Sequence, residues 1–179
     1  MLDNQPNLEA WMNGGEVQRF HQWPMLHRQQ TVAEHTFNML LISTHLYYSK
    51  SHEFAELQHS ILFHDIAEGR RGISDISSYA KRQFPGLREA AHKAEAQVEH
   101  RLGIDRWTSP YSNLNENRLK MCDKLELMWT VISQLMLGNR TLYDASWPVI
   151  IGMVGELYMD VNEHQLIEEW SERAIKIRG

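Results

Sequence analysis

A long stripe of apolar residues over 114–137 is the feature that most constrains the fold of this chain. Its positions recur every three or four residues, which is the spacing of one face of an α-helix. The stripe consists of Leu119, Cys122, Leu125, Met128, Val131, Ile132 and Leu135. It predicts a long helix that contributes one face to a buried core.

Capping signals and helical spacing predict helices along most of the remaining chain. Thr31 and Glu34 have the form of a capping box, so a helix is expected to begin at Thr31 and to run to about Tyr48. Another is expected over 53–67, where Gly69 follows directly. Further helices are expected over 8–14, 76–83, 87–102, 146–158 and 163–177.

We expect one all-α domain, a helical bundle of about seven helices that spans residues 1–179. No segment alternates with the period of two that is typical of strands, and the chain has no internal repeat or obvious linker. Pro148 falls in the first turn of its expected helix, where proline is tolerated.

Charge, cysteine content and hydropathy exclude several classes of protein. The 18 Lys and Arg against 23 Asp and Glu give a net charge of −5 without a basic run, which argues against binding to duplex nucleic acid. Cys122 is the single cysteine, so an intramolecular disulfide is excluded and a reducing cytoplasm is favoured. No signal core or transmembrane stretch is present, so we expect no membrane partner and a soluble cytoplasmic protein.

An imidazole and a carboxylate, His64 and Asp65, lie side by side at the end of an apolar run, and Glu68 follows one turn later. Adjacent residues on a helix point about 100° apart, so this pair converges only on an object between its two directions. Histidine nitrogen and aspartate oxygen are natural ligands of Mn, Fe, Co, Ni and Zn. The pair therefore predicts a metal site that other residues must complete.

His35 and Asp123 are the candidates for the missing ligands, because both lie within helical patterns. Each also has a simpler interpretation. A single histidine on a helix is more often a packed or exposed residue than a ligand. Asp123 has Lys120 three residues earlier on the same side of its helix, and the two are able to form a surface pair.

Arg19, Phe20 and Trp23 concentrate a cation and aromatic rings in a segment without helical spacing. In one interpretation this loop packs its aromatic side chains on the core. In the other it forms the lip of a pocket, where the arginine binds a phosphate and the phenylalanine contacts a base.

Several other chemistries lack their sequence signals. The chain has no glycine-rich phosphate loop, no GxGxxG, no GxSxG and no HExxH motif. Cys122 lies within the apolar stripe, which argues against a thiol nucleophile. Nitrogen and oxygen ligands on helices remain as the strongest chemical signal.

The candidate ligands occur in an order that resembles the H…HD…D signature of the HD-domain phosphohydrolases: His35, His64-Asp65 and Asp123. The similarity extends to a longer string: Arg19-Phe20, residues 31–35, residues 64–68 and Asp75-Ile76-Ser77-Ser78. This string is similar to that of the YfbR-like 5′-deoxynucleotidases and, within that group, most of all to phage dATP triphosphohydrolases of the DatZ type. The similar region covers about residues 17–137.

The resemblance implies a catalytic centre built on one divalent transition metal, which is Co, Mn, Zn, Ni or Fe. The implied metal ligands are His35, His64, Asp65 and Asp123. Glu68 would accept the proton of the attacking water, and Arg19 would orient the phosphate.

The resemblance also implies residues for substrate recognition. Phe20 stands where relatives carry tryptophan and would stack on the base or wall it off. Asp75, Ile76, Ser77 and Ser78 would line the sugar and select 2′-deoxyribose, while Lys81 and Lys120 would contact the additional phosphates of a triphosphate.

From these residues we expect an enzyme that hydrolyses dATP to deoxyadenosine and triphosphate. A 5′-deoxynucleotidase acting on dNMPs is the alternative within the same class, and a non-catalytic nucleotide-binding regulator is the alternative from another class. A helical interaction protein with an accidental His-Asp pair is a third. The resemblance further implies a homo-oligomer, a dimer or a larger assembly such as a hexamer, located in the host cytoplasm if a phage encodes it.

Overall fold

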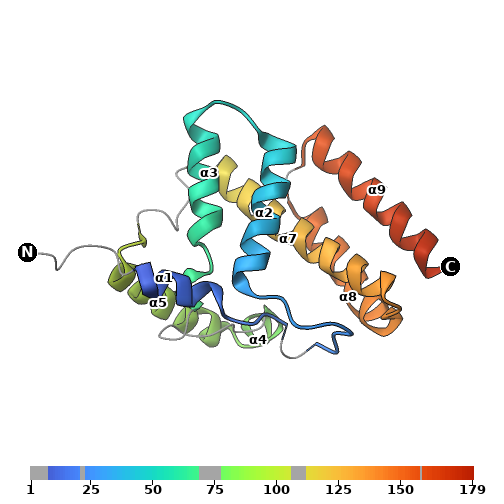
Figure 1. The fold of residues 1–179 in the computed structure, drawn as a ribbon, viewed down its shortest axis with the longest axis horizontal. Coiled ribbons are helices and arrows are strands. Elements are labelled where there is room, and N and C mark those ends of the chain that lie inside the picture. The colour runs from blue at the N-terminus through green and yellow to red at the C-terminus, as the bar shows by residue number, and fades with distance from the viewer. Residues whose placement is uncertain (1–7, 21–22, 69–77, 106–111, 158) are drawn as a thin grey trace, which may run out of the picture.

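The computed structural model describes residues 8–20, 23–68, 78–105, 112–157 and 159–179, and the predicted all-α class is confirmed (Figure 1). The elements are α1 (Leu8–Gly15), α2 (Val32–Tyr47), α3 (His52–Phe63), the 3-10 helix η1 (Ile66–Glu68), α4 (Ser78–Gln83), α5 (Pro85–Leu102), α7 (Asn113–Met136), α8 (Arg140–Gly155) and α9 (Val161–Arg178). Within these ranges, no helix combines the length and the apolar character that a membrane crossing requires.

Helix α7 runs through the centre of the fold and contacts α2, α3, α8 and α9 (Figure 1). Its predicted apolar stripe is buried from Cys122 to Leu135, whereas Leu119 is only partly buried. Each large apolar side chain that is fully buried contributes roughly 1.5–3 kcal/mol through the hydrophobic effect. The central helix therefore supplies the core against which the other helices pack.

Helices α2 and α3 form an antiparallel pair against α7 (Figure 1). The predicted capping box is confirmed, because the Thr31 hydroxyl accepts from the Glu34 backbone N–H and the Glu34 carboxylate accepts from the Thr31 backbone N–H. Met39, Leu57 and Ile61 are fully buried between the two helices and Cys122 of α7. This packing brings the beginning of α2 and the end of α3 together.

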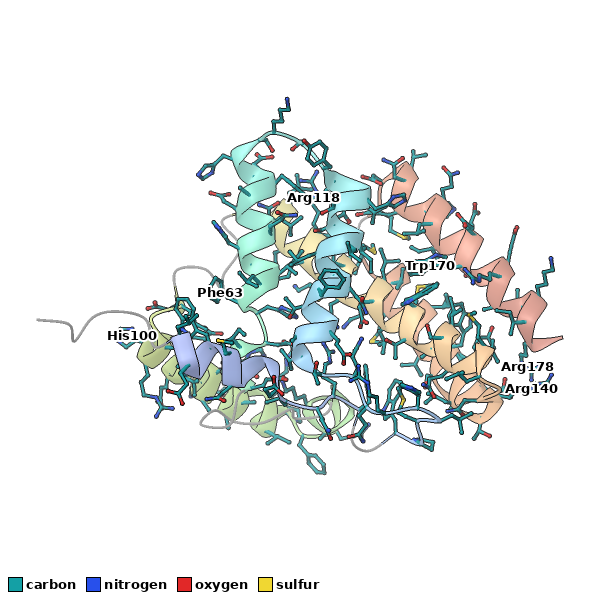
Figure 2. All side chains as sticks on the ribbon, in the orientation of Figure 1. Phe63, His100, Arg118, Arg140, Trp170 and Arg178 are labelled. Atoms are coloured by element: carbon teal, nitrogen blue, oxygen red, sulfur yellow. The ribbon has the colours of Figure 1, made fainter. Side chains whose placement is uncertain are left out.

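Helices α8 and α9 cover the other side of α7. Arg178 near the end of α9 forms a bidentate pair with Asp144 of α8, with Nε–Oδ1 at 2.7 Å and Nη2–Oδ2 at 3.2 Å. At the opposite end of α9, buried Glu163 accepts a hydrogen bond from the Tyr47 hydroxyl of α2. Figure 2 shows Arg178 and Arg140 at one end of this helix pair, and Arg118, whose guanidinium lies over the Tyr47 ring, near its other end.

Two predicted helix boundaries are wrong. The helix expected over 53–67 ends at Phe63, where His64 is the C-cap residue and its backbone N–H donates to the Ser60 carbonyl. The helix expected over 146–158 begins at Arg140, because the Asn139 side chain accepts from the Leu142 backbone N–H and caps it. Pro148 is consequently inside α8 rather than in its first turn.

Helix α1 packs against η1 through a close approach of the two backbones. A Cβ atom on buried Gly14 would lie 2.7 Å from the Ile66 carbonyl oxygen. The Trp11 ring meets the Phe63 ring edge to face at 5.1 Å, and Figure 2 shows Phe63 on this side of the molecule. Helix α1 therefore fixes the position of the segment that follows Asp65.

We expect Gly14→Ala to destabilise the protein by about 1–3 kcal/mol, because the added methyl group would collide with a backbone oxygen rather than with a flexible side chain. Gly152→Ala in α8 is the matched control, since a Cβ there meets no atom within 4 Å. Alanine favours a helix over glycine, so this control should be neutral or stabilising. Urea denaturation measures both changes, and equal stability of the two variants would contradict this account of the α1–η1 contact.

Candidate metal centre

The predicted ligands come from three separate elements that meet at one point. His35 lies in the first turns of α2, His64 and Asp65 lie in the turn after α3, and Asp123 lies on α7. His35, His64 and Asp65 each offer one ligand atom, and these three atoms lie within 4.8 Å of one another. Asp123 adjoins this group, with Oδ1 at 3.5 Å from His35 Nε2.

Both histidines turn Nε2 toward this point because Nδ1 is engaged on the outer side. His35 Nδ1 is 2.7 Å from a carboxylate oxygen of Glu126, and His64 Nδ1 is 2.6 Å from the Ile61 carbonyl oxygen. The two Nε2 atoms are 3.3 Å apart. A proton on each Nδ1 leaves a lone pair on each Nε2, which is the form of histidine that binds metals.

The two carboxylates complete a donor set of nitrogen and oxygen atoms. Asp65 Oδ2 lies 3.3 Å from His64 Nε2 and 3.7 Å from His35 Nε2. With metal–ligand bonds of about 2.1 Å, tetrahedral ligand atoms lie about 3.4 Å apart. The side chains therefore fit a divalent first-row transition metal in both chemistry and spacing.

Neighbouring cations favour the charged form of both aspartates. Burial acts to raise the pKa of Asp65, but the contact with His64 and the charge of Arg19 outweigh it, so this pKa lies below its usual range. Burial also acts to raise the pKa of Asp123, and the charges of Lys124 and Arg19 reverse that effect. Both side chains are thus carboxylates at neutral pH, as metal binding requires.

Arg19 reaches the same point from the segment before α2. Its Nη1 lies 3.2 Å from Asp65 Oδ2 and its Nη2 lies 3.7 Å from Asp123 Oδ1. The Arg19 backbone N–H donates to the Gln30 carbonyl at 2.8 Å, which holds the segment in place. The guanidinium, with its side chain only 15% exposed, is positioned to compensate charge at the centre.

The aromatic residues of this segment lie in two different surroundings. The Phe20 ring lies 5.3 Å below the Arg19 guanidinium and 4.9 Å from the Trp23 ring. Trp23 packs against the core around α7, as the first interpretation holds. Phe20 adopts a left-handed backbone conformation with φ of 59°, which is uncommon for a residue other than glycine, and it stays beside the arginine at the centre.

The remaining predicted residues differ in how close the structure brings them. Glu68 lies in η1, and its backbone N–H donates to the Asp65 carbonyl at 3.0 Å. Lys81 of α4 pairs with Glu95 of α5 at 3.1 Å. Ser78 begins α4, whereas Asp75, Ile76 and Ser77 lie outside the described residues.

Lys120 is exposed on α7 and pairs with Glu116 rather than with Asp123. The lysine that pairs with Asp123 is its neighbour Lys124, with Nζ 2.5 Å from Oδ2. The surface pair between Asp123 and Lys120 is therefore ruled out in this structure. The reason is spacing, since a glutamate and a lysine four residues apart in this order pair well on a helix.

Sequence reasoning missed two residues at the centre, Glu126 and Lys124. Glu126 is fully buried and contacts His35, and a signal for it existed: a carboxylate three residues after Asp123 stands among the apolar residues of the stripe. Lys124 is only a neighbour of Asp123 in the sequence, and no pattern singled it out.

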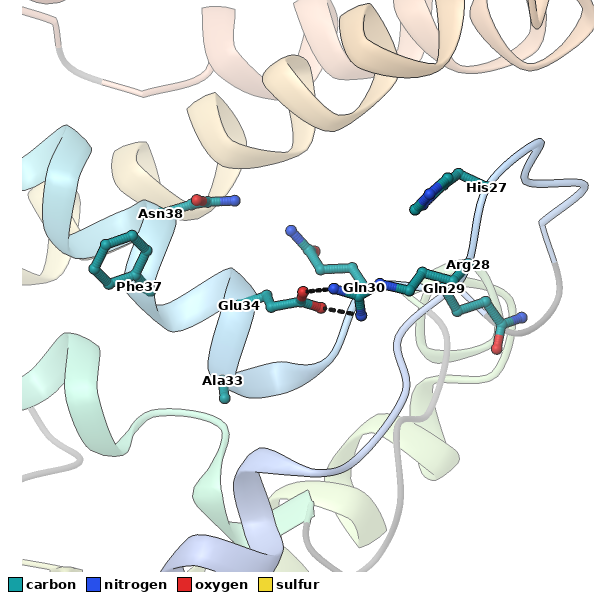
Figure 3. A pocket seen from close by; sticks show the side chains of 8 residues that line it. All are labelled: His27, Arg28, Gln29, Gln30, Ala33, Glu34, Phe37 and Asn38. Atoms are coloured by element: carbon teal, nitrogen blue, oxygen red, sulfur yellow. Dashed lines mark hydrogen bonds and ion pairs between the residues drawn. The ribbon is translucent and has the colours of Figure 1, made fainter. Parts of the chain in front are cut away.

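An open pocket of about 520 Å³ lies along the beginning of α2 and the segment before it (Figure 3). Arg28 and Glu34 form the ion pair that the dashed lines mark in Figure 3. Gln30 and Asn38 line the same pocket, and both donate to the Glu126 carboxylate. The pocket wall and the inner carboxylate are thus connected by hydrogen bonds.

Comparison with known proteins gives the context of this centre. The solved structure of the cyanophage S-2L HD phosphohydrolase DatZ, bound to dA and one catalytic Zn²⁺ ion, matches with a TM-score of 0.66. The match covers 94% of this chain and 96% of that protein at 20% sequence identity, which shows a shared fold. No curated protein sequence matches the chain. The model of the HD domain family matches residues 16–130, more than half of the sequence, and the chain therefore belongs to the HD domain family.

Proposed function

We propose that this protein is a metal-dependent phosphohydrolase that acts on 2′-deoxynucleotides. The observation that carries the proposal is the convergence of His35, His64 and Asp65 within 4.8 Å, with Asp123 and Arg19 directly beside them. Family membership and the shared fold with a phosphohydrolase bound to dA support the same activity. In this proposal His35, His64, Asp65 and Asp123 would hold one divalent metal, whose positive charge would lower the pKa of the attacking water and compensate phosphate charge.

The protein's own residues then handle the proton and the phosphate charge. Glu68, in the turn after Asp65, accepts the proton of the attacking water. Arg19 donates to the phosphate and compensates charge as the bond to the leaving group breaks. Phe20, held beside Arg19, walls off or stacks on the base, and the segment Asp75 to Ser78 lines the sugar.

Within this class we favour hydrolysis of dATP to deoxyadenosine and triphosphate. The identity of the matched structure, a phage enzyme bound to dA, supports the choice of base. Lys81 and Lys120 supply the charge that a triphosphate needs beyond a monophosphate. Both lysines now pair with partly exposed glutamates, Glu95 and Glu116. Such pairs are typically worth about 0–1 kcal/mol, so a triphosphate with several negative charges is able to replace the glutamates.

Two other candidates use the same centre. A 5′-deoxynucleotidase would act on dNMPs, and the existing glutamate partners of Lys81 and Lys120 favour it, because those lysines are then surface ion pairs. A nucleotide-binding regulator would keep the pocket without turnover. The complete set of ligands and Glu68 argues against the regulator.

We further propose that residues 1–179 form a single domain and that copies of the chain associate. Helix α7 contributes to both hydrophobic clusters, which supports one continuous core. Phe37 and Leu41 on α2 and Tyr48 directly after it are exposed, which supports an interface between copies.

Incubation with Co²⁺ or Mn²⁺ and dATP should release deoxyadenosine and intact triphosphate, while dAMP and ATP remain unchanged. HPLC of parallel reactions with dATP, dAMP, dGTP, dGMP and ATP measures the products. Nucleoside and orthophosphate from monophosphates alone would assign the protein to the 5′-deoxynucleotidases. Absence of product from all five substrates, with metal bound, would leave the nucleotide-binding regulator.

Lys81→Met and Lys120→Met should each lower kcat/KM for dATP about tenfold or more, since each removes a charged contact to the substrate worth about 1.5–3 kcal/mol. Lys93→Met is the matched control, because Lys93 also pairs with a glutamate on a helix surface, Glu89 of α5. Steady-state kinetics with dATP compares the three variants. Equal activity of all three would contradict a role of these lysines in binding a triphosphate.

A further inference from the structure

The carboxylate of Glu126 lies fully buried on α7, one helical turn after Asp123. Its Oε2 is 2.7 Å from Nδ1 of His35, which is also fully buried. The contact therefore joins α7 to the beginning of α2 at a place that bulk water does not reach. Hydrogen bonds between an ionised group and a donor are among the strongest in proteins, and burial strengthens them further.

The other oxygen of Glu126 accepts hydrogen bonds from three side chains. Gln30 Nε2 lies at 2.6 Å, Asn38 Nδ2 at 3.1 Å and Thr130 Oγ1 at 3.2 Å from Oε1. Because all three donate to one oxygen, they fix the rotation of the carboxylate and leave Oε2 to His35. Two of these donors, Gln30 and Asn38, line the pocket of Figure 3.

We propose that Glu126 is a positioning residue that fixes the tautomer of His35, with the proton on Nδ1 and the lone pair of Nε2 directed at the metal. This inference deepens the proposed function and rests on it. A carboxylate only accepts hydrogen bonds, so the ring nitrogen that faces it must carry a proton. For His64, the acceptor that faces Nδ1 is the Ile61 backbone carbonyl. For His35 it is the Glu126 side chain, which can be changed by mutation.

The variant Glu126→Gln tests this role without changing the volume of the side chain. An amide presents one oxygen and one NH₂ group. The three donors around Oε1 favour the amide oxygen on their side, which turns the NH₂ group toward His35. Nδ1 must then accept, the proton moves to Nε2, and the nitrogen that faces the metal loses its lone pair.

Glu163→Gln is the matched control. Glu163 is also a buried glutamate, 3% exposed, and its carboxylate accepts from the Tyr47 hydroxyl and from the Asp160 backbone N–H. The same chemical change at this second position tests whether loss of any buried carboxylate is sufficient to alter the centre.

The experiment measures the histidine tautomers and the metal affinity of the full chain. Two-dimensional ¹⁵N–¹H NMR of metal-free protein labelled at histidine distinguishes protonated from unprotonated ring nitrogens. We expect Nδ1–H at His35 in the wild type and in Glu163→Gln, and Nε2–H in Glu126→Gln. Competition with a chelator measures Zn²⁺ binding, which should weaken about 10- to 100-fold in Glu126→Gln and stay unchanged in the control.

Each outcome decides the inference. Nε2–H at His35 in the wild type would overturn it, as would an Nδ1–H tautomer with unchanged Zn²⁺ affinity in Glu126→Gln. If Glu126→Gln does not fold, the wild-type tautomer and Glu126→Asp, which retains the charge and should retain Nδ1–H, still decide it. Failure of the proposed function is distinguishable, because the wild type would then hold Nδ1–H at His35 but bind no Zn²⁺ and release no nucleoside.

Discussion

A cluster of one buried and two partly buried carboxylates is the constraint on which the rest of this structure depends. Asp65, Asp123 and Glu126 approach one point between α2, the end of α3 and α7. A buried carboxylate without compensation costs several kcal/mol, so the fold must supply positive charge and donors there. Arg19 contacts both aspartates, and the imidazole of His35 lies between Asp123 and Glu126. A divalent cation would complete the compensation that these groups begin.

The architecture around this charge follows from one helix that serves two purposes. Most of α7 forms the core, while Asp123 and Glu126 occupy the face that meets α2. The end of α3 delivers His64 and Asp65 from the opposite side, and η1 is held by the close packing of α1 at Gly14. Packed helices and the turn after α3 thus hold the predicted ligands, as a preorganised metal centre would require.

The sequence was informative wherever a local pattern decided the outcome. The capping box at Thr31 and the apolar stripe of α7 predicted two helices and the core, and the H…HD…D order identified residues that the fold brings together. The end of α3 was missed because Gly69 looked like the stop signal, while the chain leaves the helix already after Phe63. The start of α8 was missed because Pro148 suggested a first turn, although a capping asparagine stands nine residues earlier, at Asn139. Glu126 was missed although it stands among the apolar residues of the stripe, because its contact with His35 is tertiary and the local pattern does not name the partner.

We propose that one metal ion binds at the point shared by His35, His64, Asp65 and Asp123. The most direct test is anomalous diffraction at the zinc or cobalt absorption edge, on crystals of the protein grown with that metal. We expect one strong anomalous peak per chain, within bonding distance of Nε2 of both histidines and of an oxygen of both aspartates. A peak at another group of residues, or none at this point with the metal in excess, would contradict it.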